Sequence, residues 1–473
     1  MSGTTPAPAG SRPVAPAAGT AEAAVRRLLA AISEAGSKAE YLALADDVER
    51  ELAERFAAAY GSADFARLLA LKVVNLAVAR FHFTHRHANL ASRPVQLLLD
   101  PVNNCHLSCP GCVHSRNPAV AGHYDWPGGR LPPETFGRYL EDFGLYAFGA
   151  AFYNWGEPLL HKELPRLVRA SKSYLLHASV SSNLSLPIDA GALVASGLNF
   201  LFVAVDGASQ ATYERFRRGG DLRLCLENIA KLVRARERSG SPVPYILWRF
   251  LTFEHNLHEV DRAIELARDL GVDQISISAP FAVDWDDPAI RVARSEREGI
   301  HRLRPEATFK GPLDDWRNVE LPADEIARAA DRSWAERLAP GPAEESRGPA
   351  GATCGWLYQS ITLDALGRVM PCCMPPVNDL HRVYGRHAEA REGAFNLPDY
   401  RLSRLAFADR EAYARETAGR GPGAAPFCAI CDQNPELSYD VERDAGRDLA
   451  LLDRERLLAE GTVRALTAWP GMR

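Results

Sequence analysis

The 473-residue sequence lacks both an excess of charge of one sign and an apolar run long enough to cross a membrane. Its 55 Lys and Arg residues nearly balance its 60 Asp and Glu residues, which leaves a net charge of -5. Such a composition does not indicate a general binder of nucleic acids or anionic membranes. The most apolar stretch, residues 68–83, is interrupted by Lys72, Asn75 and Arg80, whereas a membrane-spanning helix needs about 20 mainly apolar residues. We therefore expect no nucleic-acid partner and no membrane association.

The sequence also lacks a recognisable targeting segment. Residues 1–20 are rich in Pro, Ala, Gly, Ser and Thr and contain no apolar core of the kind found in signal peptides. This composition is typical of a disordered tail. We expect a cytoplasmic protein, because thiols stay reduced in that compartment.

Cysteine is the informative residue type. The sequence has nine cysteines, an odd number, and most of them fall in tight groups. This distribution argues against a disulfide framework and favours metal ligation.

The pattern of apolar residues predicts an α/β protein with a helical N-terminal region. From residue 95 onward, short apolar runs alternate with helical stretches, and six of these runs read as strands: residues 95–99, 149–153, 176–181, 200–205, 245–253 and 274–278. Alternation of this kind implies parallel βα units with right-handed crossovers. Six units are too few for a closed eight-stranded barrel, so we predict a partial (β/α)6 barrel with its chemistry at the carboxyl ends of the strands.

The chain divides into six expected segments. They are a disordered tail (1–20), a helical N-terminal cap (21–92), the partial barrel (93–285), a linker or helical insert (286–352), a second cysteine-bearing domain (353–435) and a C-terminal helix (436–473).

The first cysteine group follows the first predicted strand. Cys105, Cys109 and Cys112 are spaced C-x3-C-x2-C on one short loop. A 4Fe–4S cluster is normally held by four cysteine thiolates. Three thiolates can bind three of its irons and leave the fourth iron open. The alternative is a zinc knuckle completed by His106 or His114.

This loop resembles the signature of the radical SAM superfamily, and the resemblance extends over residues 95–280. It implies that the three cysteines hold a 4Fe–4S cluster and that S-adenosylmethionine binds the open iron. Reduction of the cluster would then cleave S-adenosylmethionine to a 5′-deoxyadenosyl radical that abstracts hydrogen from a substrate. A ferredoxin or flavodoxin is the implied electron donor. Gly111 stands where the superfamily usually has an aromatic residue.

Further segments match the same superfamily. Asn154-Trp155-Gly156-Glu157-Pro158 resembles its Gly-Gly-Glu-Pro turn, with Trp155 in place of a glycine. The resemblance assigns Gly156 and Glu157 to the amino group of S-adenosylmethionine, although the segment also reads as an ordinary turn.

The remaining cofactor contacts are predicted at the later strands. Ser182 and Asn183 resemble the polar site for the ribose and carboxylate of S-adenosylmethionine, although such residues also cap helices. Arg249 could pair with the same carboxylate. We expect Ile277 and Ala279 to pack on adenine. The alternative is that both residues only belong to the core of the barrel.

A second cysteine group lies nearer the C-terminus. It consists of Cys354, Cys372, Cys428 and Cys431, with a predicted hairpin over residues 360–369 between the first two. By itself this set fits either a closed zinc site or an auxiliary 4Fe–4S cluster. Beside a radical SAM core it resembles the shorter, twitch form of the SPASM extension, which implies one auxiliary 4Fe–4S cluster. Cys373 could replace Cys372, and Cys225, between two leucines, reads as a core thiol.

The expected activity is that of a radical SAM oxidoreductase or lyase. The cysteine pattern resembles twitch-type enzymes that act on sugars and aminocyclitols, so we expect a small-molecule substrate in aminoglycoside-type antibiotic biosynthesis and an oxidation, dehydration or epimerisation. The alternatives are a radical SAM maturase that modifies a ribosomal peptide and, more remotely, a non-catalytic zinc scaffold. The candidate acid–base residues are Tyr153, Asp206, Glu254 and His255.

Overall fold

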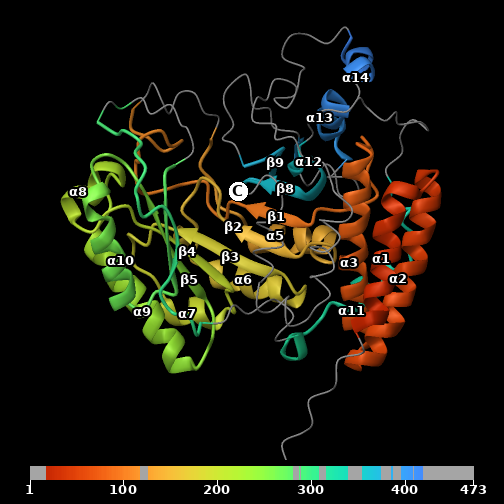
Figure 1. Ribbon diagram of the computed structural model, residues 1–473, viewed down its shortest axis with the longest axis horizontal. Coiled ribbons are helices and arrows are strands. Elements are labelled where there is room, and N and C mark those ends of the chain that lie inside the picture. The colour runs from red at the N-terminus through yellow and green to blue at the C-terminus, as the bar shows by residue number, and fades with distance from the viewer. Residues whose placement is uncertain are drawn as a thin grey trace, which may run out of the picture.

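The computed structural model describes residues 18–117, 126–280, 287, 289–307, 316–338, 354–373, 385–386, 396–408 and 410–418. Within these residues one ten-stranded mixed sheet runs through the molecule in the order β10-β9-β8-β1-β2-β3-β4-β5-β6-β7. Helices α1 to α3 stand at one end of this sheet and helices α8 to α10 at the other (Figure 1).

Six parallel strands form the centre of the sheet, and each lies where the sequence predicts one. Each pairs with the next in chain order. Their bounds are β1 (Gln96–Leu99), β2 (Gly149–Phe152), β3 (His177–Ser182), β4 (Phe200–Ala204), β5 (Tyr245–Leu251) and β6 (Gln274–Ser278). The predicted α/β class is thereby confirmed, whereas the partial barrel, the cap and the auxiliary domain stay predictions.

Four further strands extend the sheet at both edges. At one edge β7 (Gly299–Arg302) pairs antiparallel with β6. At the other, β8 (Ser360–Leu363) pairs in parallel with β1, followed by β9 (Arg368–Met370) and β10 (Gly385–Arg386). The predicted hairpin is formed by β8 and β9, and Gly367 takes the left-handed φ of 74° in its turn. The hairpin between Cys354 and Cys372 therefore continues the same sheet beside β1 (Figure 1).

Strand residues alternate between two faces of the sheet. Ile246, Trp248 and Phe250 of β5 belong to the main apolar core, which also contains residues of the surrounding helices. Their neighbours Leu247 and Arg249 lie on the opposite face, because successive side chains of a strand point to opposite sides. This opposite face is the one available for a site at the strand ends.

Three N-terminal helices pack as a unit: α1 (Ala18–Glu34), α2 (Lys38–Tyr60) and α3 (Ala63–Thr84). Gly61 ends α2 in a left-handed conformation, and the Ser62 side chain accepts from the Phe65 backbone N–H to cap α3. The Gly-Ser pair therefore provides both the stop and the start signal.

Helix α3 is buried on nearly all sides. The polar residues that interrupt its apolar run attach it to the sheet layer: Lys72 Nζ donates to the carbonyls of Gly144, at 2.7 Å, and Ala147. Asn75 Nδ2 donates to the Arg93 carbonyl at 3.0 Å. Among the helices of the described residues, none combines the length and the apolar character needed to cross a bilayer.

Shorter helices complete the described part of the chain. They are α5 (Pro133–Tyr139) with its π-helical continuation Leu140–Gly144, α6 (Leu164–Ser173), α7 (Ala190–Ala195), α8 (Gln210–Phe216), α9 (Leu222–Ser239), α10 (Val260–Asp269), α11 (Ala323–Ala330), α12 (Trp356–Gln359), α13 (Pro398–Ala408) and α14 (Arg410–Thr417). Single 3-10 turns lie at Pro158–Leu160, Leu257–Glu259 and Trp316–Asn318.

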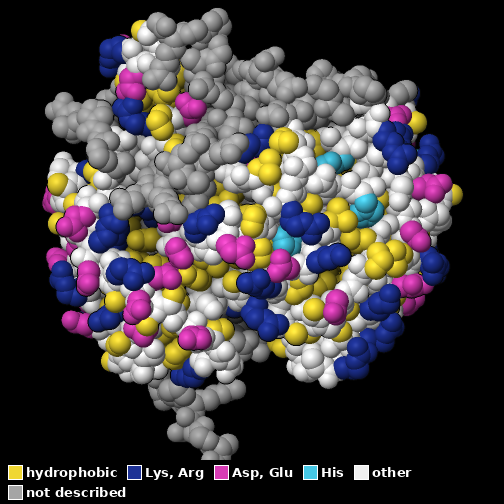
Figure 2. Space-filling model, turned by 180° about the vertical axis from the view of Figure 1, so that it is seen from behind, with side chains coloured by type: hydrophobic (Ala, Val, Ile, Leu, Met, Phe, Trp, Pro, Cys, Tyr) yellow, Lys and Arg dark blue, Asp and Glu magenta, His cyan; other side chains and the backbone are white. Residues whose placement is uncertain are grey.

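Basic and acidic side chains are interspersed over the face seen in Figure 2. This mixture agrees with the small net charge of -5. Residues 1–17 and 419–473 lie outside the described residues, so the predicted tail and C-terminal helix are not addressed, and the predicted domain boundaries stay predictions.

Candidate functional site

The three cysteines of the first group lie on one loop that follows β1. Cys109 is buried, and Cys105 and Cys112 are half-buried; all three are free thiols. The loop closes on itself through the Cys112 N–H, which donates to the Cys109 carbonyl at 3.3 Å. The Ser108 N–H donates to the Arg218 carbonyl at 3.0 Å, which ties the loop to the end of α8.

The donor set fits a cluster with several irons better than a single metal ion. Within the described residues, no three Cys, His, Asp or Glu side chains converge closely enough to hold one ion. In a 4Fe–4S cluster each cysteine binds a different iron, so the sulfurs need not meet at one point. Burial raises the pKa of all three thiols, that of Cys112 to about 12. Because a ligating cysteine must be a thiolate, bound positive charge would relieve this penalty.

The two histidines considered as zinc ligands are engaged elsewhere. His106 Nε2 lies 2.9 Å from the Ser185 carbonyl, and His114 Nε2 lies 3.0 Å from the Trp155 carbonyl. Each Nε2 therefore donates to backbone, which disfavours the zinc-knuckle alternative.

The turn after β2 is built against this loop by Asp100, the residue that follows β1. Asp100 is fully buried, and its Oδ1 accepts the backbone N–H groups of Asn154, Trp155 and Gly156 at 3.2, 3.0 and 2.9 Å. A Cβ on Gly156 would lie 1.6 Å from the Val102 carbonyl oxygen, so only glycine permits this approach. Burial raises the pKa of Asp100 to about 7.

Glu157 joins the turn to the end of β3. One of its oxygens accepts from Ser182 Oγ at 2.8 Å and the Leu159 N–H at 3.0 Å. The other accepts from the Asn183 N–H at 3.0 Å and Asn183 Nδ2 at 2.6 Å. An ionised carboxylate has about four acceptor positions, so these contacts use all of them. Burial raises the pKa of Glu157, and the hydrogen bonds oppose that shift.

The Glu157 group also reaches the cysteine loop. Asn183 Nδ2 lies 4.0 Å from Cys105 Sγ. The structure therefore brings together four predicted site residues, Gly156, Glu157, Ser182 and Asn183, beside the predicted cluster ligands. Glu157 acts here on Ser182 and Asn183, and its contact with S-adenosylmethionine stays a prediction.

Arg249 lies on the face of the sheet opposite the main core, over the ring of Phe202 at 5.8 Å from its centroid. Phe202 in turn contacts the ring of Tyr153 edge-on, with centroids 5.7 Å apart. In the part of the chain that the structure describes, no carboxylate pairs with Arg249. Its half-buried guanidinium is therefore available to an anionic group of a ligand.

Ile277 lies on the other face of the sheet. It is fully buried in the main core with Ile275, whereas Ser276 and Ser278 alternate onto the face of Arg249. The core interpretation therefore applies to Ile277, and its predicted packing on adenine is not supported by the strand geometry. Ala279 follows β6 and is half-buried.

The acid–base candidates differ in their surroundings. Asp206 is fully buried and has both oxygens engaged, one by Arg217 Nε at 2.5 Å and the other by the Leu251 N–H at 2.7 Å. Glu254 is exposed. Neither ring nitrogen of His255 has a hydrogen-bond partner among the described residues, and burial lowers its pKa. Burial raises the pKa of Tyr153.

The second cysteine group is described in part. Cys354, Cys372 and Cys373 are half-buried, and Cys428 and Cys431 lie outside the described residues. Trp155 Nε1 donates to the Cys373 carbonyl at 2.9 Å, so this region contacts the turn that carries Gly156 and Glu157. Cys225 is a fully buried thiol, as expected, and donates to the Asn183 carbonyl at 3.1 Å.

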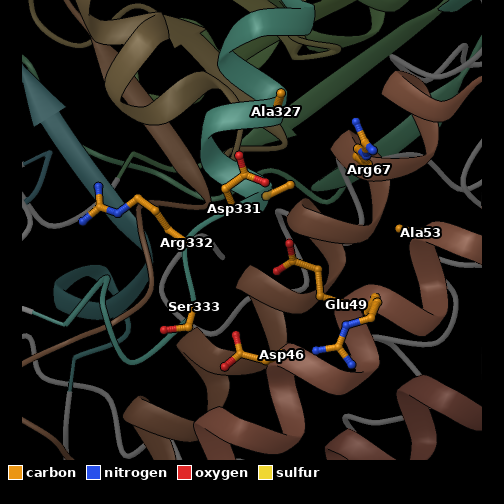
Figure 3. Close-up of a pocket in the computed structure, with 10 residues that line it drawn as sticks. Asp46, Glu49, Ala53, Arg67, Ala327, Asp331, Arg332 and Ser333 are labelled. Atoms are coloured by element: carbon orange, nitrogen blue, oxygen red, sulfur yellow. The ribbon is translucent and has the colours of Figure 1, made fainter.

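A separate cavity of about 410 Å³ lies between α2, α3 and the C-terminal end of α11 (Figure 3). Asp46 and Glu49 face it from α2, and Asp331 follows α11. The Asp46 carboxylate accepts the Trp334 N–H at 2.8 Å, and Glu49 pairs with Arg337 at 3.3 Å. These contacts brace the segment after α11 against the N-terminal helices, and the cavity contains none of the predicted site residues.

Three residues of the site were not predicted: Asp100, Arg217 and the indole of Trp155 as a contact to the second cysteine region. Asp100 could have been found from the sequence, because it directly follows an apolar strand and an aspartate is seldom fully buried unless its carboxylate has partners. Arg217 had none, because it lies beside Arg215 and Arg218 in a charged stretch of a kind that is typical of an exposed helix face.

No protein-family model matches the chain. Among curated proteins, the PqqA peptide cyclase of Ruegeria pomeroyi is 26% identical over 230 residues, covering 46% of this chain and 58% of the relative. The PqqA peptide cyclase of Gluconobacter oxydans is 23% identical over 290 residues, covering 60% and 71%. The pre-heme d1 synthase of Dinoroseobacter shibae is 27% identical over 195 residues, covering 41% and 45%. The chain thus spans less than two thirds of the first of these relatives.

The solved structures superpose only loosely on this chain. SuiB of Streptococcus suis bound to S-adenosylmethionine gives a TM-score of 0.42 at 12% identity, over 78% of each chain. Native anSMEcpe with bound AdoMet gives 0.40 at 12% identity, over 77% of this chain and 98% of that one. Overlap at this level does not inform function.

The expected sugar or aminocyclitol substrate is wrong, because relatives found over as much as 60% of the chain are peptide cyclases. The same finding leaves the small-molecule partner, the oxidoreductase or lyase type and the role in antibiotic biosynthesis without support. The physical reason is that cysteine spacing reports the ligands of a cluster, whereas the residues that contact substrate leave no such spacing.

Proposed function

We propose that this chain is a radical SAM enzyme that modifies a peptide. The observation that carries the proposal is the buried Glu157–Ser182–Asn183 group beside a loop with three free cysteines at the carboxyl end of a parallel sheet. The peptide cyclases among the relatives favour a peptide over the sugar first expected.

Cys105, Cys109 and Cys112 would hold the first 4Fe–4S cluster. When bound, this cluster supplies the low-potential electron for reductive cleavage of S-adenosylmethionine. Asp100 fixes the backbone of the adjacent turn, and Glu157 fixes Ser182 and Asn183 at its side. Polar groups that are already held in place can orient a ligand at little cost in conformational entropy.

The remaining polar groups have separate proposed tasks. Asn154 Nδ2 is buried and has no partner among the described residues, so it can donate to a bound ligand. Arg249 would pair with a carboxylate, either that of S-adenosylmethionine or one of the peptide. Ala279 remains the candidate contact for adenine.

His255 is the preferred acid–base candidate. Its two unpartnered ring nitrogens and its lowered pKa favour a neutral imidazole that can accept a proton at neutral pH. Tyr153 is the second candidate, from the face that carries Arg249. Exposed Glu254 and ion-paired Asp206 are less suited, and a positioning role for Asp206 is argued below.

An auxiliary 4Fe–4S cluster on Cys354, Cys372, Cys428 and Cys431 completes the proposal. The hydrogen bond from Trp155 to Cys373 supports this cluster, because the bond fixes the second cysteine region close to the turn that carries Gly156 and Glu157. A ferredoxin or flavodoxin remains the proposed electron donor.

The proposal is tested by anaerobic reconstitution with iron and sulfide, followed by incubation with dithionite and S-adenosylmethionine. Wild-type protein should release 5′-deoxyadenosine, and the variant C105A/C109A/C112A should release none. Absence of the product from iron-loaded wild-type protein would refute the superfamily chemistry.

The substrate class is tested separately. Synthetic peptides deuterated at side-chain carbons, and a deuterated aminocyclitol as the comparison, are each incubated with the reduced enzyme. Deuterium should appear in 5′-deoxyadenosine with a peptide. Transfer from the aminocyclitol and from none of the peptides would contradict the peptide assignment.

A further inference from the structure

Arg217 is a cation held beside the first cysteine loop. Its Nε donates to Asp206 Oδ2 at 2.5 Å, and its positive charge opposes the rise in the pKa of the Cys109 thiol that burial causes. The Arg217 side chain is 16% exposed and that of Asp206 is 0% exposed. Because arginine stays protonated in proteins, a fixed positive charge lies next to a predicted cluster ligand.

Asp206 and a phenyl ring hold this cation in place. Asp206 Oδ1 accepts the Leu251 N–H at 2.7 Å, which anchors the carboxylate to the end of β5. The guanidinium lies 5.1 Å from the centroid of the Phe216 ring, a distance typical of cation–π contacts.

The surroundings of this contact are apolar. Leu107, Cys109, Phe216, Phe253 and Ile290 form one buried cluster, against which Cys105 and Cys112 also pack. Charges in such a low-dielectric environment are screened less than surface charges. The Arg217 charge therefore acts on the cysteine loop more strongly than an exposed arginine would.

We infer that Arg217 raises the reduction potential of a cluster bound at Cys105, Cys109 and Cys112, and that Asp206 positions the guanidinium for this task. The inference rests on the proposed function, since it requires a cluster at this loop. One electron from dithionite or a ferredoxin makes the cluster one unit more negative, so a neighbouring cation stabilises the reduced form. Net charge and hydrogen bonds to sulfur are among the factors that set such potentials.

The test is a redox titration of the reconstituted holoprotein, followed by electron paramagnetic resonance of the reduced cluster. The signal that changes on addition of S-adenosylmethionine identifies the cluster with the open iron. R217M should lower the ratio of reduced to oxidised cluster about tenfold at a fixed potential, which equals about 59 mV for a one-electron couple. R217K keeps the positive charge and should change this ratio less than R217M does.

Two further variants distinguish tuning from a structural role. In D206N the amide oxygen can still accept from Arg217 Nε, so the guanidinium keeps its place while one negative charge is removed. The potential should then shift in the opposite direction to that of R217M, which general loosening of the loop would not produce. R218M is the matched control, because Arg218 is the next residue, is 43% exposed and pairs with Asp287 instead; its potential should equal that of wild type.

The outcomes separate this inference from the proposed function. A wild-type protein that binds no cluster at the three cysteines refutes the proposed function. A wild-type cluster with an unchanged potential in R217M and D206N overturns the tuning role alone. Loss of the cluster from R217M, R217K and D206N alike also overturns it, because Arg217 would then serve to hold the loop together.

Discussion

Two buried carboxylates arrange the backbone and side chains around the cysteine loop. Asp100 gathers three successive N–H groups of the turn after β2, and Glu157 gathers the donors of Ser182 and Asn183. The donors to both carboxylates are uncharged groups, and Asp100 Oδ2 has no partner among the described residues, so their buried charge depends on the geometry of the turn. Small changes in this turn should therefore have large effects.

Gly156 provides the sharpest test of the turn. In G156A the new Cβ would lie 1.6 Å from the Val102 carbonyl oxygen, so the turn must move away from the cysteine loop. We expect a loss of about 1–3 kcal/mol in unfolding free energy, as for overpacked sites, and loss of S-adenosylmethionine binding measured by equilibrium dialysis.

The matched control for that variant is G137A. Gly137 lies within α5 and has no atom within 4 Å of the position that a Cβ would take. Alanine is favoured over glycine in helices by about 1 kcal/mol, so G137A should be as stable as wild type or more so, with binding intact. Equal binding by G156A and G137A would contradict the assigned role of the turn.

Asp100 should make stability depend on pH. Its pKa is raised from 3.8 to about 7, so the folded state binds the proton more tightly than the unfolded state. The resulting stabilisation is complete below pH 3.8 and is lost as pH rises through about 7. In D100N the amide oxygen can still accept the three N–H groups, and no charge forms.

The expected result is that the stability of D100N relative to wild type rises by about 3 kcal/mol between pH 5 and pH 8. Denaturant titrations of both proteins at pH 5, 6, 7 and 8 measure this difference, and the comparison cancels the other titrating groups. Parallel stability curves over this range would show that Asp100 is already ionised at pH 5.

At the level of elements, local pattern predicted the six central strands and the N-terminal helices. Apolar runs of four to eight residues and the Gly61-Ser62 stop and start signals act within a few residues, so sequence alone reveals them. The pairing of β8 with β1 joins segments that are far apart along the chain, and no local pattern encodes that register. For the same reason the contact of Arg217 with Cys109 was not predicted.

Lys72 tests how α3 is attached to the sheet layer. Its buried ammonium donates to the carbonyls of Gly144 and Ala147, and burial lowers its pKa well below the usual value. K72M leaves both carbonyls without this donor, at about 1–3 kcal/mol for each unsatisfied group. We expect lower unfolding free energy and faster amide hydrogen exchange over residues 140–148.

The control for Lys72 is K162M, since Lys162 is exposed. Surface substitutions usually change stability by less than about 0.5 kcal/mol. Unchanged hydrogen exchange over residues 140–148 in K72M would mean that Lys72 is not needed to hold α3 against the sheet layer.

At the scale of the whole molecule, one sheet connects the two cysteine groups. β1 leads into the first group. β8 pairs with β1 and β9 pairs with β8, and β9 leads into Cys372. The indole of Trp155 bridges from the first site to the Cys373 carbonyl. An electron carrier on a continuous sheet keeps a constant distance from the site, which a flexibly linked domain would not guarantee. This arrangement favours a functional rather than a purely structural second group.

Iron content decides whether the second group holds a cluster and which cysteine it uses. Two 4Fe–4S clusters predict about eight irons per chain in reconstituted wild-type protein. C372A should retain about four, because the resemblance to the twitch extension favours Cys372 over Cys373 as the ligand. C373A should retain about eight, since its carbonyl, rather than its thiol, makes the contact with Trp155.

C225A is the matched control, because Cys225 is a fully buried thiol within α9 and is assigned to no cluster. It should also retain about eight irons if the variant folds, which circular dichroism verifies. In C372A the remaining irons should still support release of 5′-deoxyadenosine, since the first loop is intact. About four irons in wild type and all three variants would instead mean that the second group binds no cluster, whereas loss from C373A but not C372A would reassign the ligand to Cys373.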